Sequence, residues 1–213
     1  MALQNRVTPE GDIIATHHRG LFMGNRGGRI HDPETRTLTK RRFVTRRWIC
    51  CATCFRNRRR VVMGKGYTEL FFLDEPTALA AGHRPCFECR RPAATHFQRC
   101  WQLSKAWPEK PRADEMDEIL HDERLAPPTV MPLSCLPDGT ALLLPGSDGA
   151  RSKGRLSDRI ALIRAGHLLP WRAEGYGRAL PLPSDQPVTV LTPPSILGAL
   201  QQGYRPHWHP SAG

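Results

Sequence analysis

The 213-residue sequence has no long apolar run. Its longest, "WICCA" at Trp48–Ala52, is far shorter than the roughly 20 residues that a membrane-spanning helix needs. Residues 1–15 contain no apolar segment of signal-peptide length. We therefore expect neither secretion nor a membrane partner, and a location in the cytoplasm.

The common catalytic motifs are also missing. The glycine-rich stretch "GNRGG" is followed by no Gly-Lys-Ser/Thr and no signal for the start of a helix, so it is not a phosphate-binding loop. No serine triad and no supported pair of catalytic carboxylates can be recognised. The sequence thus gives no positive sign of an enzyme with turnover.

Acidic residues are scarce in the first half of the chain. Residues 1–112 contain 22 Lys and Arg against 9 Asp and Glu, a net charge of +13, whereas residues 113–213 contain 9 against 11. The basic residues include the runs "KRRFVTRR" at Lys40–Arg47 and "RNRRR" at Arg56–Arg60. Such a concentration of charge attracts polyanions, of which nucleic acid is the usual one. The alternative is a solvated basic face that has no partner.

The chain has 20 prolines and 18 glycines, which predict many turns and irregular connections. We expect an α+β fold, with a small mixed sheet and short helices around the cysteine-rich segment and an irregular C-terminal half. The change of charge near residues 108–112 predicts a boundary. It would separate a basic N-terminal domain, 1–110, from an α+β region of unknown role, 111–213.

Local patterns predict individual elements. A short helix is capped by Asp74 or Glu75, has Pro76 in its first turn and ends at Gly82. Strands are predicted at 42–50, 59–63, 67–73, 138–144 and 188–191, helices at 92–105, 112–125 and 193–202, and a loop at 146–154. Thr192 is the predicted cap of the last helix.

Seven cysteines are present: Cys50, Cys51, Cys54, Cys86, Cys89, Cys100 and Cys135. In a reducing compartment, closely spaced pairs favour a metal over disulfides. Cys86 and Cys89, two residues apart, can hold one zinc ion from a tight turn. The first cluster allows two pairings, Cys51 with Cys54 or Cys50 with Cys54. The alternative is a set of buried, metal-free cysteines.

The segment "FFLDEPTALAAGHRPCFECRRP" at Phe71–Pro92 resembles the zinc-binding domain of the Ada DNA-repair family. "RWICCATCFRNRRR", which precedes it, is similar to that domain's first cysteine pair. The resemblance covers about residues 46–97. It implies a zinc module with Cys50, Cys54, Cys86 and Cys89 as its four ligands, Cys51 being the alternative to Cys50. It also places His83 at an aromatic, packing position.

In that family, the first cysteine accepts a methyl group from a DNA methylphosphotriester. The resemblance therefore implies Cys50 as a stoichiometric methyl acceptor. We expect first a zinc-binding, nucleic-acid-binding protein, with DNA favoured. The alternatives are a self-methylating repair protein or alkylation sensor that uses Cys50, and a zinc-stabilised scaffold for protein interaction. The predicted nucleic-acid contacts are Arg46, Arg47, Arg56, Arg58, Arg59, Arg60, Arg84, Arg90 and Arg91.

Overall fold

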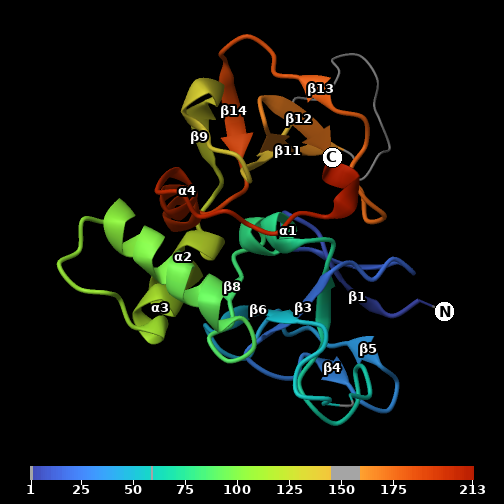
Figure 1. Ribbon diagram of the computed structural model, residues 1–213. Coiled ribbons are helices and arrows are strands. Elements are labelled where there is room, and N and C mark those ends of the chain that lie inside the picture. The colour runs from blue at the N-terminus through green and yellow to red at the C-terminus, as the bar shows by residue number, and fades with distance from the viewer. Residues whose placement is uncertain (1, 59, 145–158) are drawn as a thin grey trace.

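The computed structural model describes residues 2–58, 60–144 and 159–213; Arg59 and the predicted loop at 146–154 lie outside these ranges. The described residues form four α-helices, two six-stranded sheets and one two-stranded sheet, which confirms the α+β class. Figure 1 shows the two large sheets on either side of α1, with α2 and α3 beside them. The C-terminal half is more regular than its glycine and proline content indicated.

The first large sheet is mixed and contains the cysteine-rich segment. Its strand order is β2-β1-β7-β3-β6-β8, and a small sheet pairs β4 with β5. The bounds are β1 Gln4–Val7, β2 Ile13–Ala15, β3 Phe22–Arg26, β4 His31–Asp32, β5 Thr37–Leu38, β6 Trp48–Ala52, β7 Leu70–Phe72 and β8 Arg84–Pro85. The strand predicted at 42–50 therefore begins only at Trp48. The described part of 59–63 has no strand, and Met63 lies in a turn with a φ of 53°.

The second large sheet is antiparallel, in the order β13-β12-β11-β10-β14-β9. Its strands are β9 Thr129–Pro132, β10 Ala141–Leu143, β11 Ile160–Arg164, β12 His167–Pro170, β13 Leu180–Pro181 and β14 Pro187–Val190. Residues of β10 and β11 enter hydrophobic clusters on both faces of the sheet. The predictions at 138–144 and 188–191 correspond to β10 and β14.

The helices are α1 Glu75–Ala80, α2 Arg91–Ser104, α3 Ala113–Leu125 and α4 Pro194–Gln201, close to the predicted ranges. The Asp74 carboxylate accepts a hydrogen bond from the Thr77 amide at 3.0 Å, which confirms this cap. Gly82 has a φ of 76°, as its predicted terminating role requires. Thr192 is not the cap of α4, because its hydroxyl accepts from the Ala141 amide and Pro193 occupies the capping position.

Helix α1 lies at the centre of the molecule, and all six of its residues are buried. Leu79 packs in a cluster with α2, α3 and α4, whereas Ala80 packs against the second sheet. Ala78 and Ala81 pack against the first sheet. The hydrophobic core thus draws residues from both sides of 108–112.

Two buried carboxylates fasten the segment after residue 175 to the beginning of α1. Asp74 accepts hydrogen bonds from the Tyr176 hydroxyl at 2.8 Å and the His209 amide at 3.1 Å. Glu75 accepts from the Tyr204 hydroxyl at 2.5 Å and the His207 amide at 2.9 Å. The positive end of the helix dipole is also close to both carboxylates.

His83, directly after Gly82, is fully buried. Its ring centroid lies 4.7 Å from that of Phe72 and 5.0 Å from that of Trp48, so it has the packing role expected of an aromatic residue. Neither ring nitrogen has a hydrogen-bond partner among the described residues. Burial and the nearby Arg26 and Arg124 hold the pKa of His83 well below its usual range.

Because the folded pKa is depressed, His83 binds a proton in the unfolded chain but not in the folded one below about pH 6.5. Stability is therefore lost as the pH falls below this value. We expect His83→Phe to remove this loss. Between pH 7 and pH 5, the free energy of unfolding of the wild type should fall by about 2 kcal/mol more than that of the variant.

Urea denaturation at both pH values measures this difference. His18→Gln is the matched control, because His18 is exposed, and it should keep the pH dependence of the wild type. Parallel behaviour of His83→Phe and the wild type between pH 7 and pH 5 would contradict the prediction.

Candidate metal centre

The two cysteine clusters are joined by the pairing of β6 with β8. These strands are parallel, with Ile49 opposite Arg84 and Cys50 opposite Pro85. The Cys86 amide donates to the Cys50 carbonyl at 3.0 Å. A tight turn then leads to Cys89 before α2 begins. This strand pairing brings together two cysteine clusters that are more than 30 residues apart in the chain.

Three thiols meet at this point. The Sγ atoms of Cys51, Cys86 and Cys89 all lie within 4.8 Å of one another. Zinc–sulfur bonds of 2.3 Å in a tetrahedron place neighbouring sulfurs about 3.8 Å apart, so small shifts would let all three reach one ion. Cys86 is buried, and the other two residues are half-buried. These three cysteines could bind a metal ion.

Hydrogen bonds among these groups favour one thiolate. Those from Cys51 and Cys89 lower the pKa of the Cys86 thiol, whereas the pKa values of Cys51 and Cys89 are raised. The Ala52 amide also donates to the Cys89 sulfur at 3.4 Å. A bound metal cation would take the place of the remaining protons, so metal binding would release them.

Cys50 lies on the other face of β6, because neighbouring residues of a strand point to opposite faces. It is 0% exposed and packs with Val7, Leu70 and Phe72. Arg90 donates a hydrogen bond to its sulfur at 3.3 Å. The resemblance placed Cys50 among the ligands, whereas the structure brings its alternative, Cys51, into the group of three.

Burial raises the pKa of the Cys50 thiol despite the nearby Arg90. Since the side chain has no accessible surface, a DNA phosphotriester cannot reach it in this conformation. The alternation of side chains along a strand is the sequence signal that could have shown which of Cys50 and Cys51 faces the other thiols. Trp48 and Cys50 share the buried face of β6, which leaves Cys51 to the other face.

The other cysteines lie outside the group of three. Cys54 is exposed in the connection that follows β6. Cys100 is buried in the cluster formed by the helices, and Cys135 is exposed. The histidines that the sequence offers do not join the three thiols either.

Two of the arginines that were predicted to contact nucleic acid form ion pairs within the protein instead. Arg84 forms a two-pronged ion pair with Asp117, at 2.8 and 2.7 Å, and both side chains are buried. Arg90 pairs with the buried Glu75 at 2.7 Å. These two guanidinium groups are therefore occupied by carboxylates of the protein.

The other predicted contacts that the structure describes, which leave out Arg59, lie at or near the surface. Arg46 pairs with Glu118 of α3, Arg58 pairs with Glu88, and Arg47 lies 4.0 Å from Asp117. Glu118 and Asp117 of α3 thus compensate part of the positive charge of Arg46 and Arg47. Arg56 and Arg91 are exposed, Arg60 is half-buried, and none of the three forms an ion pair with the described residues.

Comparison of the chain with protein-family models, curated proteins and solved structures finds no significant match. Among the described residues, no helix combines the length and the apolar character that crossing a membrane would require. The metal-centre geometry and the charge distribution are therefore the basis for the functional assignment.

We expect Cys51→Ser to weaken metal binding strongly, because it removes one of the three clustered thiolates. Cys50→Ser should retain the metal, because its thiol lies in the apolar cluster. Titration with Co²⁺, followed by thiolate-to-metal absorption, measures both. Cys100→Ser is the control for the loss of a buried cysteine elsewhere. Metal retained by Cys51→Ser and lost from Cys50→Ser would contradict this assignment.

Proposed function

We propose that the protein binds one zinc ion and uses the zinc-stabilised region to bind nucleic acid, with DNA favoured. The single observation that carries the proposal is the group formed by Cys51, Cys86 and Cys89. It joins two strands and the beginning of α2, next to segments rich in arginine. A zinc ion bound there would stabilise the conformation of these basic segments.

Zinc is the metal that the donor set favours. Thiolates are soft ligands that select zinc, copper(I) and iron–sulfur clusters, and structural zinc takes four such ligands in a tetrahedron. Besides Cys50, whose thiol lies in the apolar cluster, the first cysteine cluster contains the thiol of Cys54, three residues after Cys51. We propose Cys54 as the fourth ligand, reached by an inward turn of the short connection after β6.

Exposed arginines surround this region. Arg56 and Arg58 stack on Phe55, one residue beyond Cys54, at 5.0 and 5.5 Å from the ring centroid. Arg91 stands two residues after Cys89. Arginines near an anionic zinc–thiolate centre offset its charge, and their exposed groups remain able to contact phosphates.

Metal analysis of the purified protein tests the first half of the proposal. We expect one zinc ion per chain, and loss of zinc together with local unfolding in a Cys86→Ser/Cys89→Ser double variant, because the binding energy of a structural site is folding energy. In Cys54→Ser the Co²⁺ thiolate bands should weaken but persist. Full zinc occupancy in the double variant would refute the assignment.

Nucleic-acid binding is tested by its salt dependence. We expect affinity for DNA to fall steeply as salt rises. The triple variant Arg47→Gln/Arg56→Gln/Arg91→Gln should bind all sequences more weakly, with the slope of log affinity against log salt reduced by up to about 3, because phosphate contacts carry no base specificity. Fluorescence anisotropy measures both quantities.

The matched control is Arg172→Gln/Arg178→Gln, which removes exposed arginines from the C-terminal half and should leave binding unchanged. If neither DNA nor RNA is retained near physiological salt, the basic residues do not form a nucleic-acid surface. The scaffold for protein interaction would then be the better assignment.

A further inference from the structure

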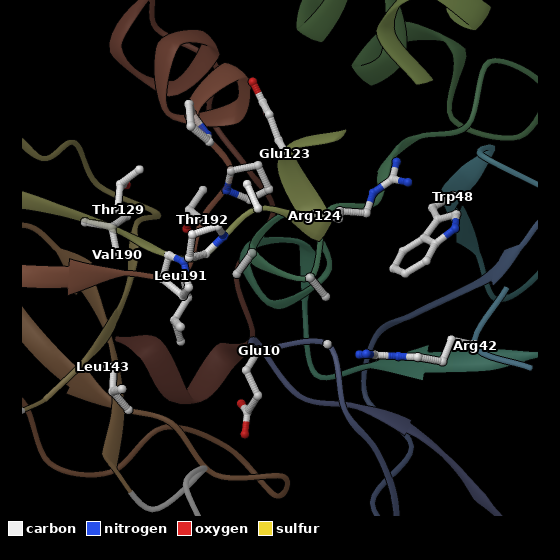
Figure 2. Close-up of a pocket in the computed structure, with 18 residues that line it drawn as sticks. Glu10, Arg42, Trp48, Glu123, Arg124, Thr129, Leu143, Val190, Leu191 and Thr192 are labelled. Atoms are coloured by element: carbon white, nitrogen blue, oxygen red, sulfur yellow. The ribbon is translucent and has the colours of Figure 1, made fainter. Parts of the chain in front are cut away.

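A cavity of about 290 Å³ is lined by residues from both large sheets, and no cysteine is among them. Figure 2 shows Trp48, Arg42 and Arg124 along one side and Leu143, Val190 and Leu191 along the other. Glu10, from the turn between β1 and β2, lies below the other labelled residues in this view, and its carboxylate points away from them. The cavity has about the volume of ten water molecules, which suits a ligand of about ten non-hydrogen atoms.

Guanidinium groups crowd around the Trp48 ring at one wall. That of Arg124 lies 4.4 Å from the ring centroid, and that of Arg26, just behind the wall, lies 4.0 Å from it. Arg26 is 2% exposed and donates to the Gly11 carbonyl at 2.7 Å. Arg42 adds a third guanidinium group to the same wall.

These cations lack a carboxylate partner. None of Arg26, Arg42 and Arg124 forms an ion pair among the described residues. The Nε of Arg26, a terminal nitrogen of Arg124 and the Trp48 Nε1 are buried without a hydrogen-bond acceptor. Burying charge without compensation is costly, and mutual repulsion adds to the cost. A bound anion would therefore compensate part of the unpaired positive charge at this wall.

Burial lowers the pKa values of Arg26 and Arg124 to about 9; repulsion from Arg42 and Arg124 adds to this effect at Arg26, whereas the nearby Asp117 and Glu123 oppose it at Arg124. A bound anion would raise both pKa values, because a nearby opposite charge favours the protonated guanidinium. The opposite walls are mostly apolar, with Ala80, Leu143, Leu191 and prolines of the 127–128 and 193–194 segments. A bare inorganic ion would leave this apolar surface uncovered.

We propose that this cavity binds a small organic anion, with one carboxylate or phosphate group against the arginines and a compact apolar body of about ten non-hydrogen atoms. Two carboxylates also line the cavity. Glu123 accepts hydrogen bonds from the amide and the hydroxyl of Ser195, and the carboxylate of Glu10 points away from the arginines in Figure 2.

Calorimetry on the purified protein tests this proposal with four probes: phenyl phosphate, benzoate, inorganic phosphate and benzyl alcohol. We expect phenyl phosphate or benzoate to bind at least tenfold more tightly than inorganic phosphate and than the neutral alcohol. The tighter of the two anions then identifies phosphate or carboxylate as the recognised group.

Arg42→Gln should weaken binding of that anion by about tenfold, since a charged hydrogen bond is lost. Arg42 is exposed, and its removal relieves repulsion, so the thermal stability of the ligand-free variant should not fall. Arg41→Gln is the matched control, because Arg41 is exposed beside it but does not line the cavity, and it should bind as the wild type does.

Three results would overturn the proposal. The first is equal affinity for benzyl alcohol and benzoate, which would indicate an apolar pocket without anion recognition. The second is unchanged binding in Arg42→Gln. The third is the absence of binding by phenyl phosphate and benzoate at 10 mM, roughly the weakest affinity expected of a single charged contact.

Discussion

The architecture depends on two carboxylates buried at the beginning of one short helix. Asp74 and Glu75 open α1, and between them they take hydrogen bonds from Tyr176, Tyr204 and two backbone amides of the 207–209 segment. Arg90 neutralises Glu75 and also donates to Cys50. Burying a carboxylate costs much less free energy when it is hydrogen-bonded, as both of these are. The helix, both sheets and the segment beside the thiols are therefore held in one arrangement.

Local patterns identified the helices because their signals are short-range. Asp74 and Gly82 mark the two ends of α1, and the spacing of Phe97 and Trp101 marks the buried face of α2. Most strands of the second sheet were not predicted. β11 and β12 carry only short apolar runs between turns, and their strand conformation depends on pairing with neighbouring strands. Charge could not reveal that the two halves share a core, since buried apolar contacts leave no trace in net charge.

At the candidate metal centre, too, local patterns predicted one part of the arrangement, whereas contacts between distant segments determine the rest. The spacing of Cys86 and Cys89 indicated a metal, but the choice between Cys50 and Cys51 depends on which face of β6 is turned toward the core. Similarly, the sequence could not show that Arg84 and Arg90 serve buried carboxylates, because Asp117 is 33 residues from Arg84 in the chain. The arginine-lined cavity was not foreseen at all, since its walls come from segments spread between residues 10 and 194.

The distances along the chain also set an order of events during synthesis. The hydrogen bonds to Asp74 and Glu75 span 102 to 135 residues. At ribosomal speeds of about 5–20 residues per second, the two carboxylates are therefore synthesised roughly 5–27 s before their partners. The three clustered thiols, by contrast, are all present once Cys89 has been made. A metal ion could therefore join β6, β8 and α2 on the nascent chain well before the core around α1 closes.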